Sequence, residues 1–317
     1  MPEPVVDVCA LWLDRDSWRA LIQRLAGFGP RYLTRFAPLM TRWAQADPAL
    51  VIRLLDAGDL DRVVDVLVAD LPVDLDPAQR AEQNQQEGIT AEVLHGMAEV
   101  LPDGSTVNHR LLEASREVPG AQVWAGISLT ADQPSTMLRL VEEGARGFTV
   151  SPFDEAISPC ASACEWFFRT ASEIGVPVWL HSGAHLRSDV AMDICSWQEF
   201  DRLAERWPDL TLVAGHGCWP WLREMVAVMQ RHPQVYLEIS THRPARMPRP
   251  GSGFARLIEF GGSTVAGQVL FGSGGPWVHR KPRHHVAAEV HELGLDPQVA
   301  RAWLHDNATR LLQEGAA

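Results

Sequence analysis

The sequence has few cysteines and no long apolar run, and these two shortages exclude several classes of protein. Its 317 residues include five cysteines, an odd number scattered along the chain. Such a set is typical of a reduced intracellular protein and not of a disulfide scaffold, and no Cys-x-x-Cys pair suggests a zinc knuckle. No apolar run approaches the roughly 20 residues that a membrane-spanning helix needs.

The sequence also lacks a targeting signal and an excess of cations. The N-terminus has neither the cationic start nor the apolar core of a signal peptide, so we expect a cytoplasmic protein. Only 28 Lys and Arg face 40 Asp and Glu, which gives a formal net charge of −12. An acidic balance argues against nucleic acids and anionic membranes as partners, but it permits a small anionic substrate in a locally basic pocket.

What the chain does contain is a series of short, apolar runs separated by stretches with the period of a helix. The predicted strands are residues 5–12, 62–68, 122–129, 147–153, 176–182, 210–216, 235–240 and 268–273. The predicted helices between them are residues 108–118, 134–144, 160–174, 196–207 and 219–232. This alternation predicts the α/β class and a parallel (β/α)8 TIM barrel. An open doubly wound sheet is the alternative, but no glycine-rich phosphate loop follows the first strand.

We interpret residues 1–317 as a single barrel domain with one large insertion. Residues 13–60 contain three helical patterns and are predicted to form a helical insertion, or cap, over the barrel mouth. The polar segment 73–92 is predicted to be an exposed helix or a mobile loop.

Two histidines stand where a TIM barrel carries its catalytic groups, at the carboxyl ends of strands. His181 closes the predicted fifth strand and His216 closes the sixth. An imidazole that ends an apolar strand is poorly explained as core filling, because a buried polar ring needs partners. We therefore predict that His181 and His216 are catalytic. The alternative for each is a buried histidine that is hydrogen-bonded to a carbonyl group.

Other candidates come from the first strand and from the loops that follow the later strands. Cys9 is either a thiolate ligand or nucleophile in the mouth, or a small core residue. Basic and aromatic loop residues would hold a carboxylate or wall a planar substrate, although a basic run is often only a solvated loop. The predicted substrate-binding residues are Arg187, Trp219, His242, Trp277 and His279.

An ordered series of motifs resembles the amidohydrolase superfamily, in the branch that contains aminocarboxymuconate-semialdehyde decarboxylase and γ-resorcylate decarboxylase. The likeness spans nearly the whole chain and includes VDVCALW, IGVPVWLHSGAH, LTLVAGHGCWP, HPQVYLEIS and VLFGSGGPW. The resemblance implies a (β/α)8 barrel with one divalent metal, commonly zinc. Its usual ligands are a His-x-His or Glu-x-His pair on strand one, a histidine on strand five and an aspartate on strand eight. A strand-six histidine serves as acid/base or ligand, and the resemblance suggests a homodimer.

The match to this ligand set is incomplete. His181 and His216 fit the strand-five and strand-six histidines, but Cys9 and Leu11 replace the His-x-His pair. Gly274 stands where the strand-eight aspartate is expected. If a metal is retained, Cys9, His181 and His216 are the predicted ligands. Because the aspartate that would take a proton from a metal-bound water is missing, the sequence favours a metal-free site. It does not decide whether a cofactor is bound.

Three hypotheses for function follow. The first is an enzyme that acts on a small cyclic or aromatic carboxylate by histidine acid/base chemistry, as a decarboxylase, another lyase or a hydrolase. The second is a Cys-His-His metal-dependent hydrolase or lyase. The third is a non-catalytic binding protein on an inherited barrel, which leaves both histidines unexplained.

Overall fold

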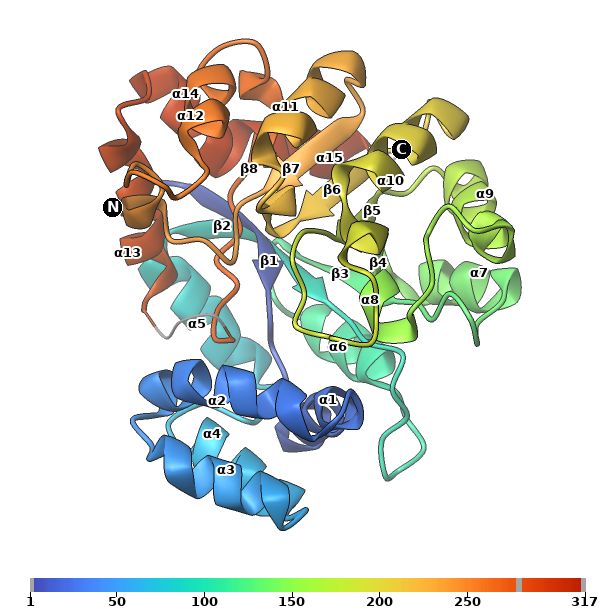
Figure 1. Ribbon diagram of the computed structural model, residues 1–317, viewed down its shortest axis with the longest axis vertical. Helices are drawn as coiled ribbons and strands as arrows, with labels where there is room; N and C mark the ends of the chain where they lie inside the picture. The colour runs from blue at the N-terminus through green and yellow to red at the C-terminus, as the bar shows by residue number, and fades with distance from the viewer. Residues whose placement is uncertain (1–2, 278–280, 315–317) are drawn as a thin grey trace.

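The computed structural model describes residues 3–277 and 281–314, and its centre is a ring of eight parallel strands in the order β1 to β8 (Figure 1). The strands are β1 Val5–Ala10, β2 Ile89–His95, β3 Ala121–Gly126, β4 Gly147–Val150, β5 Val178–His181, β6 Leu212–Gly215, β7 Val235–Glu238 and β8 Val269–Leu270. The first and last strands are joined by backbone hydrogen bonds, from Val8 N–H to the Phe271 carbonyl (3.0 Å) and from Gly274 N–H to the Cys9 carbonyl (2.8 Å). The predicted (β/α)8 barrel is confirmed.

Helices surround this ring of strands (Figure 1). From β2 onward they are α6 Val107–Ser115, α7 Pro134–Glu143, α8 Pro152–Glu155, α9 Glu165–Ile174, α10 Trp197–Arg206, α11 Leu222–Arg231, α12 Ala255–Gly261, α13 Arg283–Ala288, α14 Pro297–Arg301 and α15 Asn307–Glu314. Short 3-10 turns and one π turn complete them: η1 Ser162–Cys164, η2 Met192–Cys195, η3 His216–Cys218, η4 Pro244–Arg246, η5 Ala266–Gln268, η6 Glu289–Leu293 and η7 Ala302–Asp306. Within the described residues, no helix combines the length and apolar character needed to cross a membrane.

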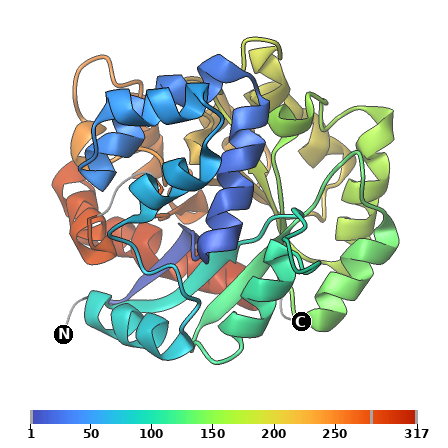
Figure 2. The same cartoon turned by 90° about the horizontal axis from the view of Figure 1, so that it is seen from below.

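Five helices lie between β1 and β2, and the first four of them cap one end of the barrel (Figure 1). They are α1 Arg15–Gly27, α2 Pro30–Ala44, α3 Pro48–Asp56, α4 Leu60–Val68 and α5 Pro77–Glu87. The first four gather below the barrel in Figure 1 and lie in front of the strands in Figure 2. Arg24 of α1 pairs with Glu99 after β2 (2.9 Å), and Arg35 of α2 donates to the Leu186 carbonyl after β5 (3.2 Å). Because these loops follow the carboxyl ends of strands, the helices lie over the barrel mouth.

The strand predicted at residues 62–68 is wrong, because this segment belongs to α4. Its buried side chains follow helical spacing along one face, and the Asp59 side chain caps the helix by accepting from the Arg62 N–H. The second strand is instead Ile89–His95, which begins within the segment 73–92 that was predicted to be an exposed helix or loop; the earlier part of that segment forms the helix Pro77–Glu87. Glu92 interrupts the apolar pattern of this strand and yet is fully buried.

Buried ion pairs explain how Glu92 is tolerated inside the fold. Its carboxylate accepts from the guanidinium of Arg80 (2.5 Å) and from that of Arg283 (2.8 Å), and Asn84 donates to it as well. Arg283 also donates to Glu87 (2.6 Å). Burial alone would raise the pKa of Glu92, but the two guanidinium groups lower this pKa to about 2. The network ties α13 to β2 and α5.

We expect the substitution Arg283→Met to lower the free energy of unfolding by about 3–5 kcal/mol, because it leaves buried carboxylates without one of their cations. Urea denaturation measures the loss. The matched control is Arg256→Met on α12, which breaks an exposed pair with Glu259 and should cost at most about 1 kcal/mol. Equal losses for the two variants would show that the buried network does not stabilise the fold.

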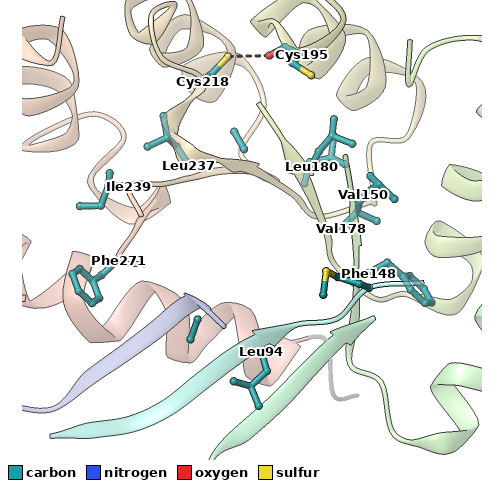
Figure 3. Close-up of a cluster of buried hydrophobic side chains, with 14 of the residues drawn as sticks. Leu94, Phe148, Val150, Val178, Leu180, Cys195, Cys218, Leu237, Ile239 and Phe271 are labelled. Atoms are coloured by element: carbon teal, nitrogen blue, oxygen red, sulfur yellow. Dashed lines mark hydrogen bonds between the residues drawn. The ribbon is translucent and has the colours of Figure 1, made fainter. Parts of the chain in front are cut away.

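The strands bury side chains on both faces. Figure 3 shows Leu94, Phe148, Leu180, Leu237 and Phe271 around the outside of the ring of strands, where they pack under the helices. A separate buried cluster comes from the alternate positions of the strands and from α15; its members include Val8, Val93, Trp124, Trp179, Val213, Tyr236, Leu270 and Leu311. Since successive strand residues face opposite sides, the inward position of Trp179 places His181 on the same inner face.

Candidate functional site

The structure brings the two predicted catalytic histidines together. His181 ends β5 and is aligned with Gly215 of β6, which directly precedes His216. The ring centroids of His181 and His216 are 5.0 Å apart and their planes are inclined at 78°. The His216 side chain is 20% exposed, so a ligand can reach it.

The indole of Trp179 packs against both imidazole rings. Its ring centroid lies 5.1 Å from that of His216 and 6.1 Å from that of His181. Gly215 makes room for it, because a Cβ atom at this position would come within 2.1 Å of the indole. His216 itself has a φ of +63°, a left-handed conformation that is uncommon for a residue with a side chain. The backbone conformation at the end of β6 therefore determines where the His216 ring lies.

A fully buried carboxylate, Glu238 at the end of β7, holds His216 in place. Its Oε1 accepts hydrogen bonds from His216 N–H (2.6 Å), Ser240 Oγ (2.9 Å) and Trp179 Nε1 (3.3 Å), and its Oε2 accepts from Ser240 N–H (2.6 Å). Burial alone would raise the pKa of Glu238, but the hydrogen bonds from His216 and Ser240 outweigh it and lower that pKa. Glu238 is thus a buried carboxylate anion beside an imidazole.

The contacts of His216 define which ring nitrogen is available. His216 Nδ1 lies 2.7 Å from Ser240 Oγ and 3.3 Å from Glu238 Oε1. These contacts orient the ring and leave Nε2 as the nitrogen that they do not engage. The carboxylate of Glu238 can balance a positive charge on the ring, so the arrangement suits a group that donates and accepts a proton.

His181 has a different environment. Burial, together with the neighbouring His216, lowers the pKa of the His181 imidazole well below its ordinary value. Phe153 packs against it with a centroid distance of 4.4 Å, and the buried Nδ1 has no hydrogen-bond partner. The His181 imidazole is neutral, whereas the His216 imidazole contacts the carboxylate of Glu238. One ring can therefore act as the base and the other as the acid.

Within the described part of the chain, the group whose ligating atoms lie within 4.8 Å of one another is Cys9, His216 and Glu238. It differs from the predicted set of Cys9, His181 and His216, because Glu238 takes the place of His181. The two oxygens of Glu238 together already accept four hydrogen bonds from protein donors. Gly274 offers no side chain, and its N–H donates to the Cys9 carbonyl. Burial, together with the neighbouring Glu238, raises the pKa of the Cys9 thiol well above its ordinary value, which opposes the thiolate form that binds a metal. This donor set therefore does not fit the divalent metal that the resemblance implies.

His95, at the end of β2, lies at the site but is not among the residues predicted from the sequence. Its Nε2 lies 2.9 Å from the Val8 carbonyl and its Nδ1 lies 2.7 Å from Thr149 Oγ1. Burial lowers the pKa of His95 to about 4, so the ring is neutral and packs 4.8 Å from Trp179. The signal that could have found it is the period-two pattern of Ile89–His95.

Two of the predicted substrate-binding residues are engaged with the cap. Arg187 pairs with Asp189, donates to two backbone carbonyls and lies 4.7 Å over the Phe28 ring. Trp277 stacks against Trp18 of α1 at 6.1 Å. Both side chains connect mouth loops to helices.

The remaining predicted substrate-binding residues lie near the mouth or outside the description. Trp219 is 38% exposed and donates from Nε1 to the Ser252 carbonyl. His242 packs between Trp219 and Phe254, and burial lowers the pKa of His242 to about 4. His279 lies outside the described residues.

Comparisons with known proteins agree with this architecture. The family model described as Amidohydrolase matches residues 66–313, which is most of the chain. No curated protein matches the sequence.

Several solved structures share the fold. An uncharacterized TIM-barrel protein, Bb4693 from Bordetella bronchiseptica, is 19% identical with a TM-score of 0.63, over 99% of this chain and 100% of that one. A 5-carboxyvanillate decarboxylase from Novosphingobium aromaticivorans, complexed with manganese and a nitrobenzoic acid, is 13% identical with a TM-score of 0.59, over 98% and 96% of the two chains. A probable 2-pyrone-4,6-dicarboxylic acid hydrolase from Acinetobacter baumannii, with citric acid bound, is 14% identical with a TM-score of 0.55, over 75% and 89%.

Proposed function

This chain belongs to the amidohydrolase family, and we propose that it is an enzyme that acts on a small cyclic or aromatic carboxylate through His181 and His216, without a metal. The observation that carries the proposal is the pair of rings 5.0 Å apart, one neutral and one supported by Glu238. Two relatives of the same fold are named for activities on ring carboxylates, one a decarboxylase and one a hydrolase.

Decarboxylation makes the simplest use of this pair. A protonated His216 would donate its proton from Nε2 to the ring carbon that bears the carboxylate. The carbon–carbon bond then breaks, CO2 leaves, and the electron pair of that bond returns to the ring. Glu238 would balance the charge on His216 before the transfer, and solvent would restore the proton afterwards. Such a positioned acid contributes typically 10²–10⁴-fold in rate.

Hydrolysis is the second candidate, and the neutral state of His181 favours it. A neutral imidazole can take a proton from water as the water attacks a ring ester, while His216 donates a proton to the leaving oxygen. Hydrolysis needs one acid and one base at neighbouring strand ends, whereas the decarboxylation needs the acid alone. Both reactions place the substrate against the same two rings.

The test is turnover without metal. We expect the purified protein to convert one of 2,6-dihydroxybenzoate, 5-carboxyvanillate or 2-pyrone-4,6-dicarboxylate, followed as CO2 release or loss of ring absorbance. Dialysis against a chelator should leave the rate unchanged, and elemental analysis should find only substoichiometric metal, because the buried Cys9 thiol has a raised pKa that opposes the thiolate form of a ligand. A rate that falls on chelation and returns with Zn²⁺ or Mn²⁺ would refute the metal-free mechanism and favour metal-dependent chemistry.

A further inference from the structure

The hydroxyl group of Ser240 lies between the imidazole of His216 and the carboxylate of Glu238, and the proposed reaction gives it no role of its own. Its Oγ lies 2.7 Å from Nδ1 of His216 and 2.9 Å from Oε1 of Glu238. The backbone N–H of Ser240 donates to the other oxygen of Glu238, Oε2, at 2.6 Å. Ser240 is 3% exposed and Glu238 is fully buried, so bulk water does not compete for these contacts.

The end of β7 and the segment after β8 together place Ser240 beside Glu238. Ile239, the residue between the two, packs in the buried cluster outside the ring of strands (Figure 3), so its two neighbours face the inside. Gly272 makes room for both side chains, because a Cβ atom there would come within 2.8 Å of Glu238 Oε2 and 3.0 Å of Ser240 Cβ. A side chain at position 272 would therefore displace the serine or the carboxylate.

The directions of the hydrogen bonds at Ser240 can be assigned, because a hydroxyl group has only one proton to donate. Glu238 is an anion that can only accept, and a charged acceptor makes the stronger hydrogen bond. The hydroxyl of Ser240 therefore donates to Glu238 and turns a lone pair towards His216. The reverse direction would leave Oε1 of Glu238 facing bare lone pairs on Oγ and on Nδ1, which lies 3.3 Å from it.

This assignment also fixes the position of the proton on the imidazole. A neutral imidazole has one N–H and one bare nitrogen. Since Oγ of Ser240 accepts, Nδ1 of His216 donates, and the bare nitrogen is Nε2. A proton that His216 exchanges with a substrate then leaves and returns at Nε2, and the ring keeps one tautomer from one turnover to the next.

We propose that Ser240 is a positioning residue that fixes the tautomer of His216: its hydroxyl accepts from Nδ1–H, donates to Glu238 and keeps Nε2 as the nitrogen that exchanges protons. This inference rests on the proposed function, because it assumes that His216 transfers a proton, but it is the same for decarboxylation and for hydrolysis.

The first test observes the tautomer directly. Long-range ¹H–¹⁵N spectra of protein labelled at histidine distinguish an N–H nitrogen from a bare one, and the signals of His216 are those lost in His216→Asn. In the neutral wild-type ring we expect the proton on Nδ1. This preference should shrink in Ser240→Ala, which has no acceptor, and in Ser240→Cys, whose thiol is a weak donor and acceptor. Because cysteine keeps the shape of serine, it separates loss of the hydroxyl from the cavity that alanine leaves.

The second test is the division of the effect between kcat and KM for the ring carboxylate that the protein converts. In Ser240→Ala we expect kcat to fall about tenfold, the effect of one hydrogen bond to a charged group, with KM unchanged because Ser240 binds His216 and not the substrate. The control Ser115→Ala removes another buried hydroxyl, which donates to the Leu112 carbonyl within α6 (3.3 Å). It should keep the His216 signals and kcat, and melting temperatures identify any variant that fails to fold.

The outcomes separate this proposal from the proposed function. A neutral wild-type ring with its proton on Nε2 would refute the role of Ser240, and so would an unchanged kcat in Ser240→Ala. A preference for Nδ1–H that persists in both variants would also refute it, and would assign the tautomer to the direct contact of His216 with Glu238. These results leave the proposed function standing. The expected tautomer without conversion of any ring carboxylate would instead refute the proposed function alone.

Discussion

The substitution His216→Asn should lower the turnover of the substrate by about 10²–10⁴-fold, the contribution of a positioned acid or base. Asparagine is the informative replacement because it tolerates the left-handed backbone at this residue, where φ is +63°. Its amide can still bond to Ser240, which lies 2.7 Å from the His216 ring, but it cannot carry a proton. Steady-state kinetics measures the loss, and circular dichroism should show an unchanged fold.

The control for this variant is His109→Asn. His109 lies on α6, its side chain is 40% exposed, and it pairs with Glu143 at the end of α7. The rate of this control should match that of the wild-type protein. If the rate of His216→Asn were also close to that of the wild-type protein, His216 would not be the proton donor, and its assignment as a catalytic residue would have to be abandoned.

The parts of the fold that the sequence predicts well are those with a local physical signal. Strands that are buried on both faces read as short apolar runs, and β5 and β6 were placed by such runs. A polar ring that closes an apolar run marks the carboxyl end of a strand, which is why His181 and His216 were found. The second strand is misplaced for two reasons. The apolar face of α4 has the same hydrophobic pattern as a short buried strand, and Glu92 gives β2 the polar pattern of an exposed segment.

The rest of the site depends on contacts between distant parts of the chain, and these have no local signal. Glu238 ends β7, but its importance comes from donors on three elements: Trp179 of β5, and His216 and Ser240 in the segments that follow β6 and β7. The pairing of Arg24 with Glu99 arises only when the cap docks on the mouth. Periodicity cannot report either arrangement.

The substitution Glu238→Gln should have the second large effect, first of all on stability. Gln has the same shape, but its amide nitrogen replaces one of two oxygens that accept four hydrogen bonds inside the barrel. In either orientation at least one buried N–H loses its acceptor and meets another donor, so we expect the free energy of unfolding to fall by about 1–3 kcal/mol. Urea denaturation measures this loss. The control Glu199→Gln, also a buried carboxylate that accepts from a backbone N–H, should lose stability by a comparable amount and keep its activity.

The catalytic effect of Glu238→Gln should appear only through His216. Without the carboxylate, no anion balances a positive charge on the ring, so turnover should fall even at temperatures where the variant is fully folded. A double-mutant cycle with His216→Asn separates the two effects. If Glu238 acts by supporting His216, the double variant should be no slower than His216→Asn alone, because groups that act as a unit are strongly non-additive. Losses that simply multiply would instead mean that Glu238 affects the reaction independently of the imidazole.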